Sequence, residues 1–218
     1  MLLLVTLMTL MKNLAMKNNA FTYSRRGVAL ALAASVTLGA WPTGATAFDV
    51  NTARALVDKV VSEINSIIVS GAAEPKMLAA FEKVFLRYAD VDIIAKATLG
   101  VAGRLASSEQ LNAFTKAFQG YISRKYGRRF REFIGGNIKV IDAKPLKSYF
   151  EIETLATLKG ASPFDLRWWV SSKSGQDKFF NLVIEGVSLL TAERLEIGAL
   201  LDQNKGDLDA LIEKLKRI

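Results

Sequence analysis

Acidic side chains that could act in pairs are the first groups in this sequence whose spacing could support chemistry. Asp90 and Asp92 stand near Glu82, and Glu151 and Glu153 are two residues apart. Paired carboxylates can act as general acid and base when their environments separate their pKa values. The simpler interpretation is that Asp92 caps a helix and that the two strand glutamates face solvent. We therefore expect no catalytic carboxylate pair.

The chain contains neither histidine nor cysteine. Their absence removes the usual general base, every Ser-His-Asp arrangement, thiolate nucleophiles, disulfides and the commonest zinc ligands. The run 185–188 also lacks the second glycine of a nucleophile elbow, because Leu190 occupies its place after Ser188. The sequence therefore favours a protein that is not an enzyme, and it predicts no catalytic residue, metal site or cofactor.

Cations crowd the end of a long predicted helix, with aromatic residues between them. They are Arg124, Lys125, Arg128, Arg129 and Arg131, interleaved with Tyr126, Phe130 and Phe133. Clustered arginines with aromatics are typical of nucleic-acid binding, which the export signal described below argues against. Two interpretations stay open. One is a solvated helix face whose cations oppose the negative end of the helix dipole. The other is a docking surface for an acidic partner or anionic head groups, formed by Arg124, Arg128 and Arg129.

Phenylalanine is abundant: eleven of the twelve residues of this type follow residue 47. Phe81 and Phe85 share one face of a predicted helix, and Phe114 and Phe118 share a face of the next long helix. Such a stripe either fills a core or lines a cavity, and spacing alone does not distinguish the two. A cavity for hydrocarbon chains needs many apolar contacts, because each buried methylene contributes only about 0.8 kcal/mol.

Apolar residues recur at three and four positions through the first half of the chain, which predicts helices. Asp49 or Asn51 is expected to cap the first helix, which ends near Gly71. The further predicted helices begin at Pro75, at Asp92 (ending at Leu99–Gly100) and at Ser107 (ending at Gly135–Gly136), and two more cover 192–201 and the segment capped by Asp207.

After the glycine pair the period changes to two, which predicts strands over 138–142, 149–158, 164–171 and 179–185 in an antiparallel meander. Alternation places Ile152 with Phe150, Thr154, Ala156 and Leu158 on one strand face, and Leu166 and Trp168 with Phe164 and Val170 on another. Helices followed by a sheet are typical of an α+β domain, here a helical layer on a four-stranded sheet with a C-terminal helix.

The first 47 residues have the features of a cleavable export signal. Arg25 and Arg26 precede the uncharged run 28–41, Pro42 ends it, and 45–47 supply small residues where a signal peptidase cleaves. This run of 14 residues is shorter than the roughly 20 that span a bilayer. We therefore expect cleavage after Ala47, one domain over 48–218, and a net charge of +4 from the 25 basic and 21 acidic residues that remain.

Two details of the N-terminus leave alternatives open. Ser24 with the two arginines resembles a twin-arginine signal, but Val28 replaces the usual phenylalanine, so both that route and general secretion are consistent with the sequence. A second apolar stretch precedes the charged region, which indicates a start at Met16 instead of Met1.

Two groups of residues together resemble one known family, the MlaC or toluene-tolerance (Ttg2D-like) periplasmic phospholipid-binding proteins, over Asp49 to the C-terminus. The first group is Phe81, Phe85, Tyr88–Asp90, Ile94–Ala95, Leu99–Gly100, Arg104, Gln110, Phe114, Phe118 and Tyr126, and the second is Asp165–Arg167 with Asn181–Leu189.

The resemblance implies a helical layer wrapped on a twisted antiparallel sheet, a cone related to NTF2-like folds, with an apolar cavity for acyl chains between the layers. It implies a monomeric carrier that shuttles phospholipid between an outer-membrane lipoprotein complex and an inner-membrane ABC transporter with an MCE-domain protein, and so maintains outer-membrane asymmetry. The residues expected to contact lipid are Phe81, Phe85, Phe114, Phe118, Ile152, Leu166, Trp168 and Val183.

The sequence departs from the family pattern at Glu193, where tyrosine is common, and at Asn181, where aspartate is frequent. A sub-branch associated with hopanoid export shares the fold, so a polycyclic lipid is an alternative cargo that the Trp168–Trp169 pair would suit. Alternatives of another class are a basic periplasmic scaffold without cargo and an NTF2-like enzyme.

Overall fold

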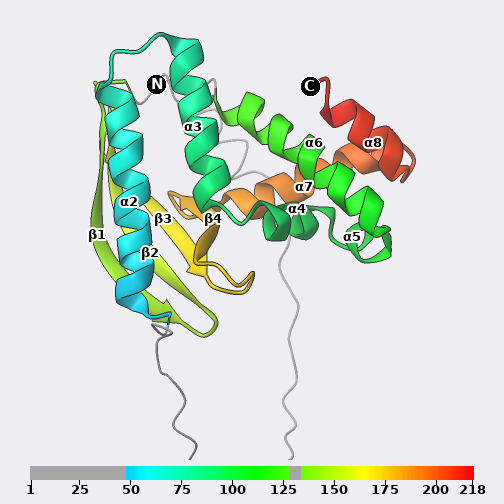
Figure 1. The fold of residues 1–218 in the computed structure, drawn as a ribbon, viewed down its shortest axis with the longest axis horizontal. Coiled ribbons are helices and arrows are strands. Elements are labelled where there is room, and N and C mark those ends of the chain that lie inside the picture. Colours follow the sequence, from blue (N-terminus) through cyan, green and yellow to red (C-terminus); the bar gives the residue numbers. More distant parts are fainter. Residues whose placement is uncertain (1–47, 128–133) are drawn as a thin grey trace, which may run out of the picture. The chain divides into compact units, whose positions relative to one another are not determined.

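Helices precede and follow an antiparallel sheet in the residues that the computed structural model describes, which are 48–127 and 134–218 (Figure 1). The predicted export signal, the residues Arg128 and Arg129, and the last part of the long predicted helix lie outside these ranges. The described elements are α2 (Val50–Val69), α3 (Glu74–Tyr88), α4 (Val91–Leu99), α5 (Ala102–Leu105), α6 (Ser108–Gly127), β1 (Asn137–Leu146), β2 (Tyr149–Thr157), β3 (Phe164–Ser171), β4 (Lys178–Ile184), β5 (Val187–Ser188), α7 (Leu189–Gln203) and α8 (Leu208–Leu215). The α+β class is confirmed.

Helix α2 covers one face of the sheet. Of the two residues that could cap it, Asp49 does so, because its carboxylate accepts a hydrogen bond from the backbone N–H of Thr52 at 2.8 Å. The apolar stripe of the helix, which includes Val57, Val60 and Ile64, is buried. The helix contacts β1, β2 and β3, so its apolar face closes the inner side of the sheet.

The strands follow the order β1-β2-β3-β4-β5, and every neighbouring pair is antiparallel. The meander is confirmed, but the sheet has five strands instead of four. Glu185 and Gly186 have φ angles of 49° and 81° and form the two-residue turn that joins β4 to β5. The sequence gives no alternation signal for β5 because it has only two residues. The segment that resembled a nucleophile elbow is therefore a hairpin turn.

The inner face of the sheet carries the residues that alternation assigned to it. Ile152 pairs with Trp168, and Thr154 pairs with Leu166, so these side chains point to the same side. A bulge between Trp169 and Val170 shifts the register with β4. As a result Val170 pairs with Phe179, whose side chain joins the inner face.

The cap of α4 differs from the prediction. Asp90, not Asp92, is its N-cap, and its carboxylate accepts a bond from the Ile93 N–H at 3.4 Å. Asp92 lies in the first helical turn. The backbone N–H of Asp90 donates to the Phe179 carbonyl at 2.8 Å, and this contact with β4 fixes where the helix begins. A contact across almost ninety residues gives no local sequence signal, so the two aspartates could not be told apart.

The starts of α3, α6 and α8 agree with the sequence. Pro75 lies in the first turn of α3. Ser107 and Gln110 form a reciprocal capping box at α6, with both backbone-to-side-chain distances at 3.2 Å. Asp207 caps α8 by accepting from the Ala210 N–H at 3.0 Å. Helix α7 begins three residues earlier than predicted, with Ser188 as its cap, and the single turn α5 was not predicted.

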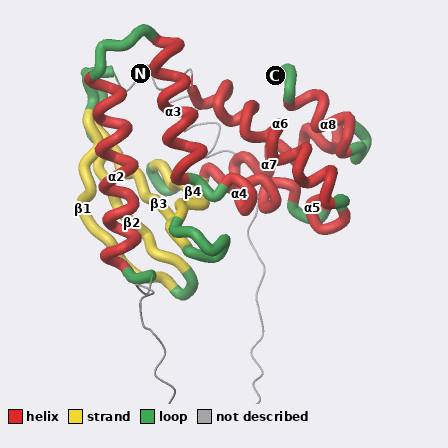
Figure 2. Tube along the Cα trace, in the orientation of Figure 1, coloured by secondary structure: helices red, strands yellow, loops and turns green. Residues whose placement is uncertain are grey.

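The described residues contain two clusters of buried hydrophobic side chains. Figure 2 shows the helices and strands that contribute to them. The first, called the sheet cluster, joins α2 and α3 to the inner face of the sheet. The second, called the helix cluster, joins α4, α6, α7 and α8. Among the described residues, the partly buried side chains that pack against both clusters are Phe85 of α3 and Ile94 of α4. We call this pair the seam.

Candidate functional site

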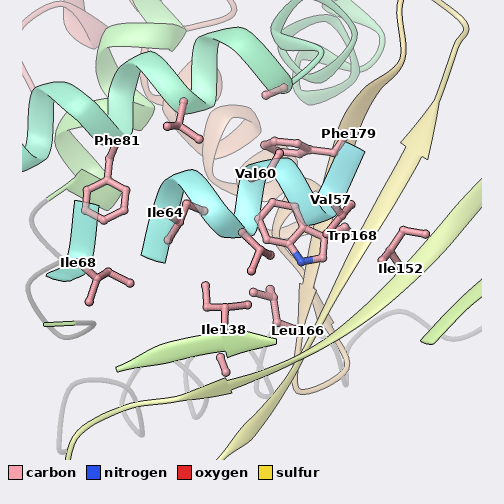
Figure 3. Close-up of a cluster of buried hydrophobic side chains, with 14 of the residues drawn as sticks. Val57, Val60, Ile64, Ile68, Phe81, Ile138, Ile152, Leu166, Trp168 and Phe179 are labelled. Carbon is pink, nitrogen blue, oxygen red and sulfur yellow. The ribbon is translucent and has the colours of Figure 1, made fainter. Parts of the chain in front are cut away.

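Four of the predicted contact residues lie together in the sheet cluster. Phe81, Ile152, Leu166 and Trp168 have exposed fractions of 2%, 0%, 5% and 3%. Figure 3 shows Leu166 and Trp168 directed from the strands toward α2, with Phe81 approaching from α3. These side chains lie buried between the sheet and the helices.

Trp168 is held by specific contacts on both its polar and its apolar sides. Its indole Nε1 donates to Thr154 Oγ1 at 3.1 Å, and that hydroxyl donates to the Leu166 carbonyl at 2.7 Å. Its ring meets Phe179 edge to face, with centroids 5.2 Å apart and an interplanar angle of 87°. The hydrogen bond satisfies the buried indole N–H and fixes the ring as one rigid wall of the cluster.

Phe114 and Phe118 lie in the helix cluster instead. Both are 0% exposed, and their rings stack with centroids 5.7 Å apart. Buried leucines of α8, including Leu211 and Leu215, belong to the same cluster. The aromatic stripe that the sequence treated as one feature is therefore divided between two separate cores.

Phe85 is the predicted residue that links the two cores. It is partly buried and packs against both clusters, as Ile94 does. Its ring lies 6.2 Å from that of Phe179, in an edge-to-face arrangement. The seam is therefore the place where apolar side chains of the sheet cluster and the helix cluster come together.

Val183 belongs to neither cluster. It pairs with Arg167, whereas its neighbour Ile184 pairs with Leu166 of the inner face. Val183 is buried on the outer face of β4, the strand that contacts α7. Alternation within one strand reveals two faces but not which of them is the inner one, and this explains the placement.

The two adjacent tryptophans point to opposite faces of β3. Trp169 lies on the outer face, where its ring centroid is 4.8 Å from that of Tyr149 and 6.0 Å from that of Phe180. Its Nε1 donates to Glu151 Oε2 at 2.8 Å, and Lys144 Nζ lies 3.1 Å from Glu151 Oε1. Trp168 and Trp169 therefore do not form one platform for a polycyclic ring system.

A polar network joins α6 to α7 above the helix cluster, and we call it the α6–α7 network. Lys125 Nζ donates to Glu193 Oε1 at 2.7 Å, to Tyr121 Oη at 2.9 Å and to Glu196. Tyr121 donates to Glu196 Oε1 at 2.7 Å, and Tyr126 donates to Glu193 Oε1. Glu193 is 3% exposed, and its Oε2 has no hydrogen-bond partner within the described part of the chain.

The α6–α7 network changes the ionisation of its members. Burial raises the pKa of the Tyr121 hydroxyl, and the nearby Glu193 carboxylate raises it further, so the phenol stays neutral and donates. Burial also acts to raise the pKa of Glu196, but hydrogen bonds from Lys125 and Tyr121 outweigh it and leave that pKa below its ordinary value. Glu196 is therefore charged at neutral pH.

The sequence indicated two members of this network, Lys125 and Glu193, but did not predict that they are in contact. Lys125 was noted only as a member of a cationic run, and Glu193 only as a departure from the family pattern. Tyr121 lies on the buried stripe of α6. The missing information was that α7 packs beside α6, which places Glu193 near Lys125 across 68 residues.

Arg124, a predicted docking residue, is used within the fold. Its Nε donates to the Ile218 carbonyl at 2.8 Å and its Nη2 to the Leu215 carbonyl at 2.6 Å. These acceptors lie at the C-terminal end of α8, where a cation opposes the negative end of the helix dipole. Arg124 therefore ties α6 to α8.

The carboxylates first considered for chemistry are separated. Asp90 caps α4, and Glu151 binds Trp169 and Lys144 on the outer sheet face. Within 48–127 and 134–218 there is no group of three side chains suited to hold a metal ion. No helix in these ranges is long and apolar enough to cross a membrane.

A groove of about 490 Å³ lies between α2 and β1. Five of its nine lining residues are polar, namely Asp58, Ser62, Asn65, Ser66 and Lys139. Asn65 closes part of it by donating to the Ile138 carbonyl at 3.0 Å and accepting from the Ile138 N–H at 3.1 Å. This open groove with a mixed polar and apolar lining is not the enclosed apolar site that hydrocarbon chains require.

The fold and the residue types define a class: an α+β protein with apolar cores between helices and sheet, in which Asp90 and Glu151 have structural roles. Comparison with known proteins agrees with this class. The family model described as MlaC protein matches residues 54–217, and the chain therefore belongs to the MlaC protein family.

Two relatives show the range of similarity. The intermembrane phospholipid transport system binding protein MlaC of Haemophilus influenzae is 26% identical over 166 residues, which cover 73% of this chain and 77% of the relative. The solved structure of a phospholipid-binding protein from Ralstonia solanacearum, in complex with a phospholipid, superposes with a TM-score of 0.65 at 16% identity. That match covers 75% of this chain and 94% of the solved one, and it confirms the fold.

Proposed function

We propose that this protein is a periplasmic phospholipid carrier. It would be exported, cleaved after Ala47, and would shuttle lipid between an outer-membrane lipoprotein complex and an inner-membrane ABC transporter with an MCE-domain protein. Its action would maintain the lipid asymmetry of the outer membrane. Membership of the MlaC family and the names of both relatives support lipid binding as the activity.

The observation that carries the proposal is the seam. Phe85 and Ile94 are partly buried and connect two clusters that are otherwise packed separately. A small separation of the helices at this position would expose apolar side chains on both sides, and acyl chains would replace those contacts. Each methylene transferred from water contributes about 0.8 kcal/mol, so two acyl chains can offset the cost of separating the cores.

Under this proposal the predicted contact residues have different roles. Phe85 would touch the acyl chains directly. Phe81, Ile152, Leu166 and Trp168 would form the wall on the sheet side, and Phe114 and Phe118 the wall on the helix side. Val183 lies on the outer face of β4 and is not included.

Transfer requires that docking lower the affinity of the carrier for its lipid. A partner that bound loaded and empty carrier equally would shift nothing, however tightly it bound. The seam provides a physical basis for such coupling, because a partner that changed the distance between α3 and α6 would change the lipid contacts. Helices α3 and α6 are in contact.

Native mass spectrometry of the protein purified from its own periplasm tests the proposal. We expect an adduct with the mass of a phospholipid, whose fragments identify the class. A hopanoid adduct would support the alternative cargo. Protein that is always empty, and that also fails to take up lipid from vesicles, would overturn the carrier.

A matched pair of variants tests the seam. Phe85→Gln places a polar amide at the junction of the clusters and is expected to lower lipid occupancy about ten-fold with the fold retained, because the amide must be desolvated beside the acyl chains. Leu155→Gln on the outer sheet face, where the side chain is 41% exposed, is the control and should leave occupancy unchanged. Equal occupancy in the two folded variants would remove the seam from the binding site.

A further inference from the structure

The turn α5 and the residue before it carry two of the most exposed large apolar side chains in the described residues. Leu105 is 82% exposed and Val101, which immediately precedes the turn, is 58% exposed. Both lie at the corner where the chain passes from α4 to α6 (Figure 1). Exposed aliphatic residues this close together are commonly found where a protein meets another surface.

The backbone of this corner packs closely against α4. Gly100 has a φ of 59°, a conformation that favours glycine, and it ends α4. A Cβ on Gly103 would lie 3.0 Å from the Lys96 carbonyl oxygen, which means that α5 lies directly against α4. Val101 and Leu105 flank this contact and face solvent.

Three cationic residues lie on or against the same corner. Lys96 and Arg104 are exposed, and the guanidinium of Arg194 from α7 lies against Gly100, 3.1 Å from where a Cβ would stand. In the described ranges none of the three forms an ion pair with a carboxylate. Glu193, next to Arg194, is buried and bound to Lys125. Two exposed acids lie near the patch in sequence: Asp92, one turn before Lys96 on α4, and Glu109 at the start of α6. We call these five residues, Lys96, Val101, Arg104, Leu105 and Arg194, the corner patch.

We propose that the corner patch docks on the surface of a membrane that contains anionic phospholipid. Val101 and Leu105 enter the boundary between head groups and acyl chains, while Lys96, Arg104 and Arg194 contact phosphate groups. Aliphatic side chains beside cations are the combination that holds proteins on such surfaces. Each cation near an anionic surface strengthens binding about five-fold at moderate ionic strength.

The same features argue against a protein as the main occupant. A stable protein interface covers about 800 Å² on each partner and is usually centred on aromatic side chains. The corner patch has no aromatic residue, and its two apolar side chains project singly from one turn. A fluid lipid surface needs no complementary pocket, and it can accept two projecting aliphatic side chains.

Vesicle flotation with the purified protein tests the proposal. Vesicles of phosphatidylglycerol and phosphatidylcholine in equal parts should bind the protein at about 50 mM salt, and pure phosphatidylcholine should not. Binding should fall steeply as salt rises to 0.5 M, since the Debye length shortens to a few ångström. The double variant Val101→Ser/Leu105→Ser should lose roughly ten-fold in partitioning. Lys96→Gln/Arg104→Gln should lose roughly twenty-five-fold, at about five-fold for each cation.

A matched control replaces exposed apolar and basic residues on another surface, formed by α2 and β1. Val69 and Ile141 are 76% and 49% exposed, and Lys139 is exposed near them, so Val69→Ser/Ile141→Ser/Lys139→Gln removes equivalent groups elsewhere. This variant should float like the wild type. Equal losses in the control and the corner variants would overturn the proposal, as would binding that is indifferent to lipid charge. Binding only to vesicles that carry a membrane protein would assign the patch to a protein partner.

The membrane proposal and the carrier proposal fail in different ways. Lipid occupancy is measured by native mass spectrometry on the same corner variants. Lost flotation with unchanged occupancy supports docking at the corner patch separately from cargo binding. A wild-type protein that floats but never carries lipid would overturn the carrier and leave the membrane contact in place.

Discussion

The sheet cluster and the helix cluster reach the same degree of burial by different means. Strand register holds the first, since Ile152, Leu166 and Trp168 are placed by backbone pairing between distant strands. The second consists of helices without a backbone ladder between them, and side chains supply the links: Arg124 to the end of α8, and Lys125 to Glu193 of α7. The sheet cluster is therefore the more rigid support, and the helix cluster is the part that substitutions and pH can loosen.

The largest expected effect is the loss of a ring from the helix cluster. Phe118 is 0% exposed and stacks on Phe114, so Phe118→Ala leaves a cavity that should lower the free energy of unfolding by about 3–5 kcal/mol. The rate of amide hydrogen exchange should rise in α4, α6 and α8 and change less in β2 and β3. The reason is that, among the described residues, the two clusters share only the seam. If amide exchange accelerated equally in the sheet and in the helices, the two clusters would unfold as one unit. Leu105→Ala, at an exposed site, is the control and should change stability by less than about 0.5 kcal/mol.

The second effect concerns the charged link between α6 and α7. Glu193→Gln removes the charge that faces Lys125 in a mostly buried position, and we expect a loss of about 1–3 kcal/mol in chemical denaturation. The double variant Lys125→Met/Glu193→Gln should lose less than the two single variants together, since it leaves no buried Glu193 carboxylate without its cation. Strict additivity would show that the pair does not stabilise the helix cluster. Glu213→Gln, which removes the exposed pair with Lys216, should have little effect.

The fold could be predicted from local patterns more completely than the site could. Helix caps such as Ser107 and Asp207, and the alternation around Ile152 and Trp168, are encoded within a few residues, and the structure confirms them. Asp90 in place of Asp92, Val183 on the outer face and the division of the phenylalanines all depend on contacts between distant segments. The same holds for Glu193, whose partner lies 68 residues away. Residues distant in sequence define the site, whereas neighbours in sequence define the elements.

A smaller effect separates the two tryptophans. Trp168→Phe removes the bond to Thr154 and part of a buried ring, so we expect a loss of about 1–2 kcal/mol in chemical denaturation. Trp169→Phe removes a partly exposed indole whose acceptor, Glu151, still has Lys144, and the loss should be under about 1 kcal/mol. An equal or larger loss for Trp169→Phe would mean that the outer sheet face stabilises the protein as much as the inner face does.

The smallest effect is the pH dependence of the helix cluster. The pKa of Glu196 is lowered in the folded protein, because hydrogen bonds from Lys125 and Tyr121 outweigh burial. Its contribution to stability is therefore present above the ordinary pKa of a glutamate and is lost as pH falls through the lower, folded value. The side chain is 47% exposed, so solvent screening keeps this contribution under about 1 kcal/mol.

Unfolding free energies measured from pH 6 to pH 3 test this directly. The difference between the wild type and Glu196→Gln should shrink as the pH falls, because the wild-type carboxylate becomes neutral like the amide. Other carboxyls with lowered pKa values, such as Glu151 on the sheet, are present in both proteins and cancel in the difference. A difference that stays constant across this range would show that the charge of Glu196 does not stabilise the contact between α6 and α7.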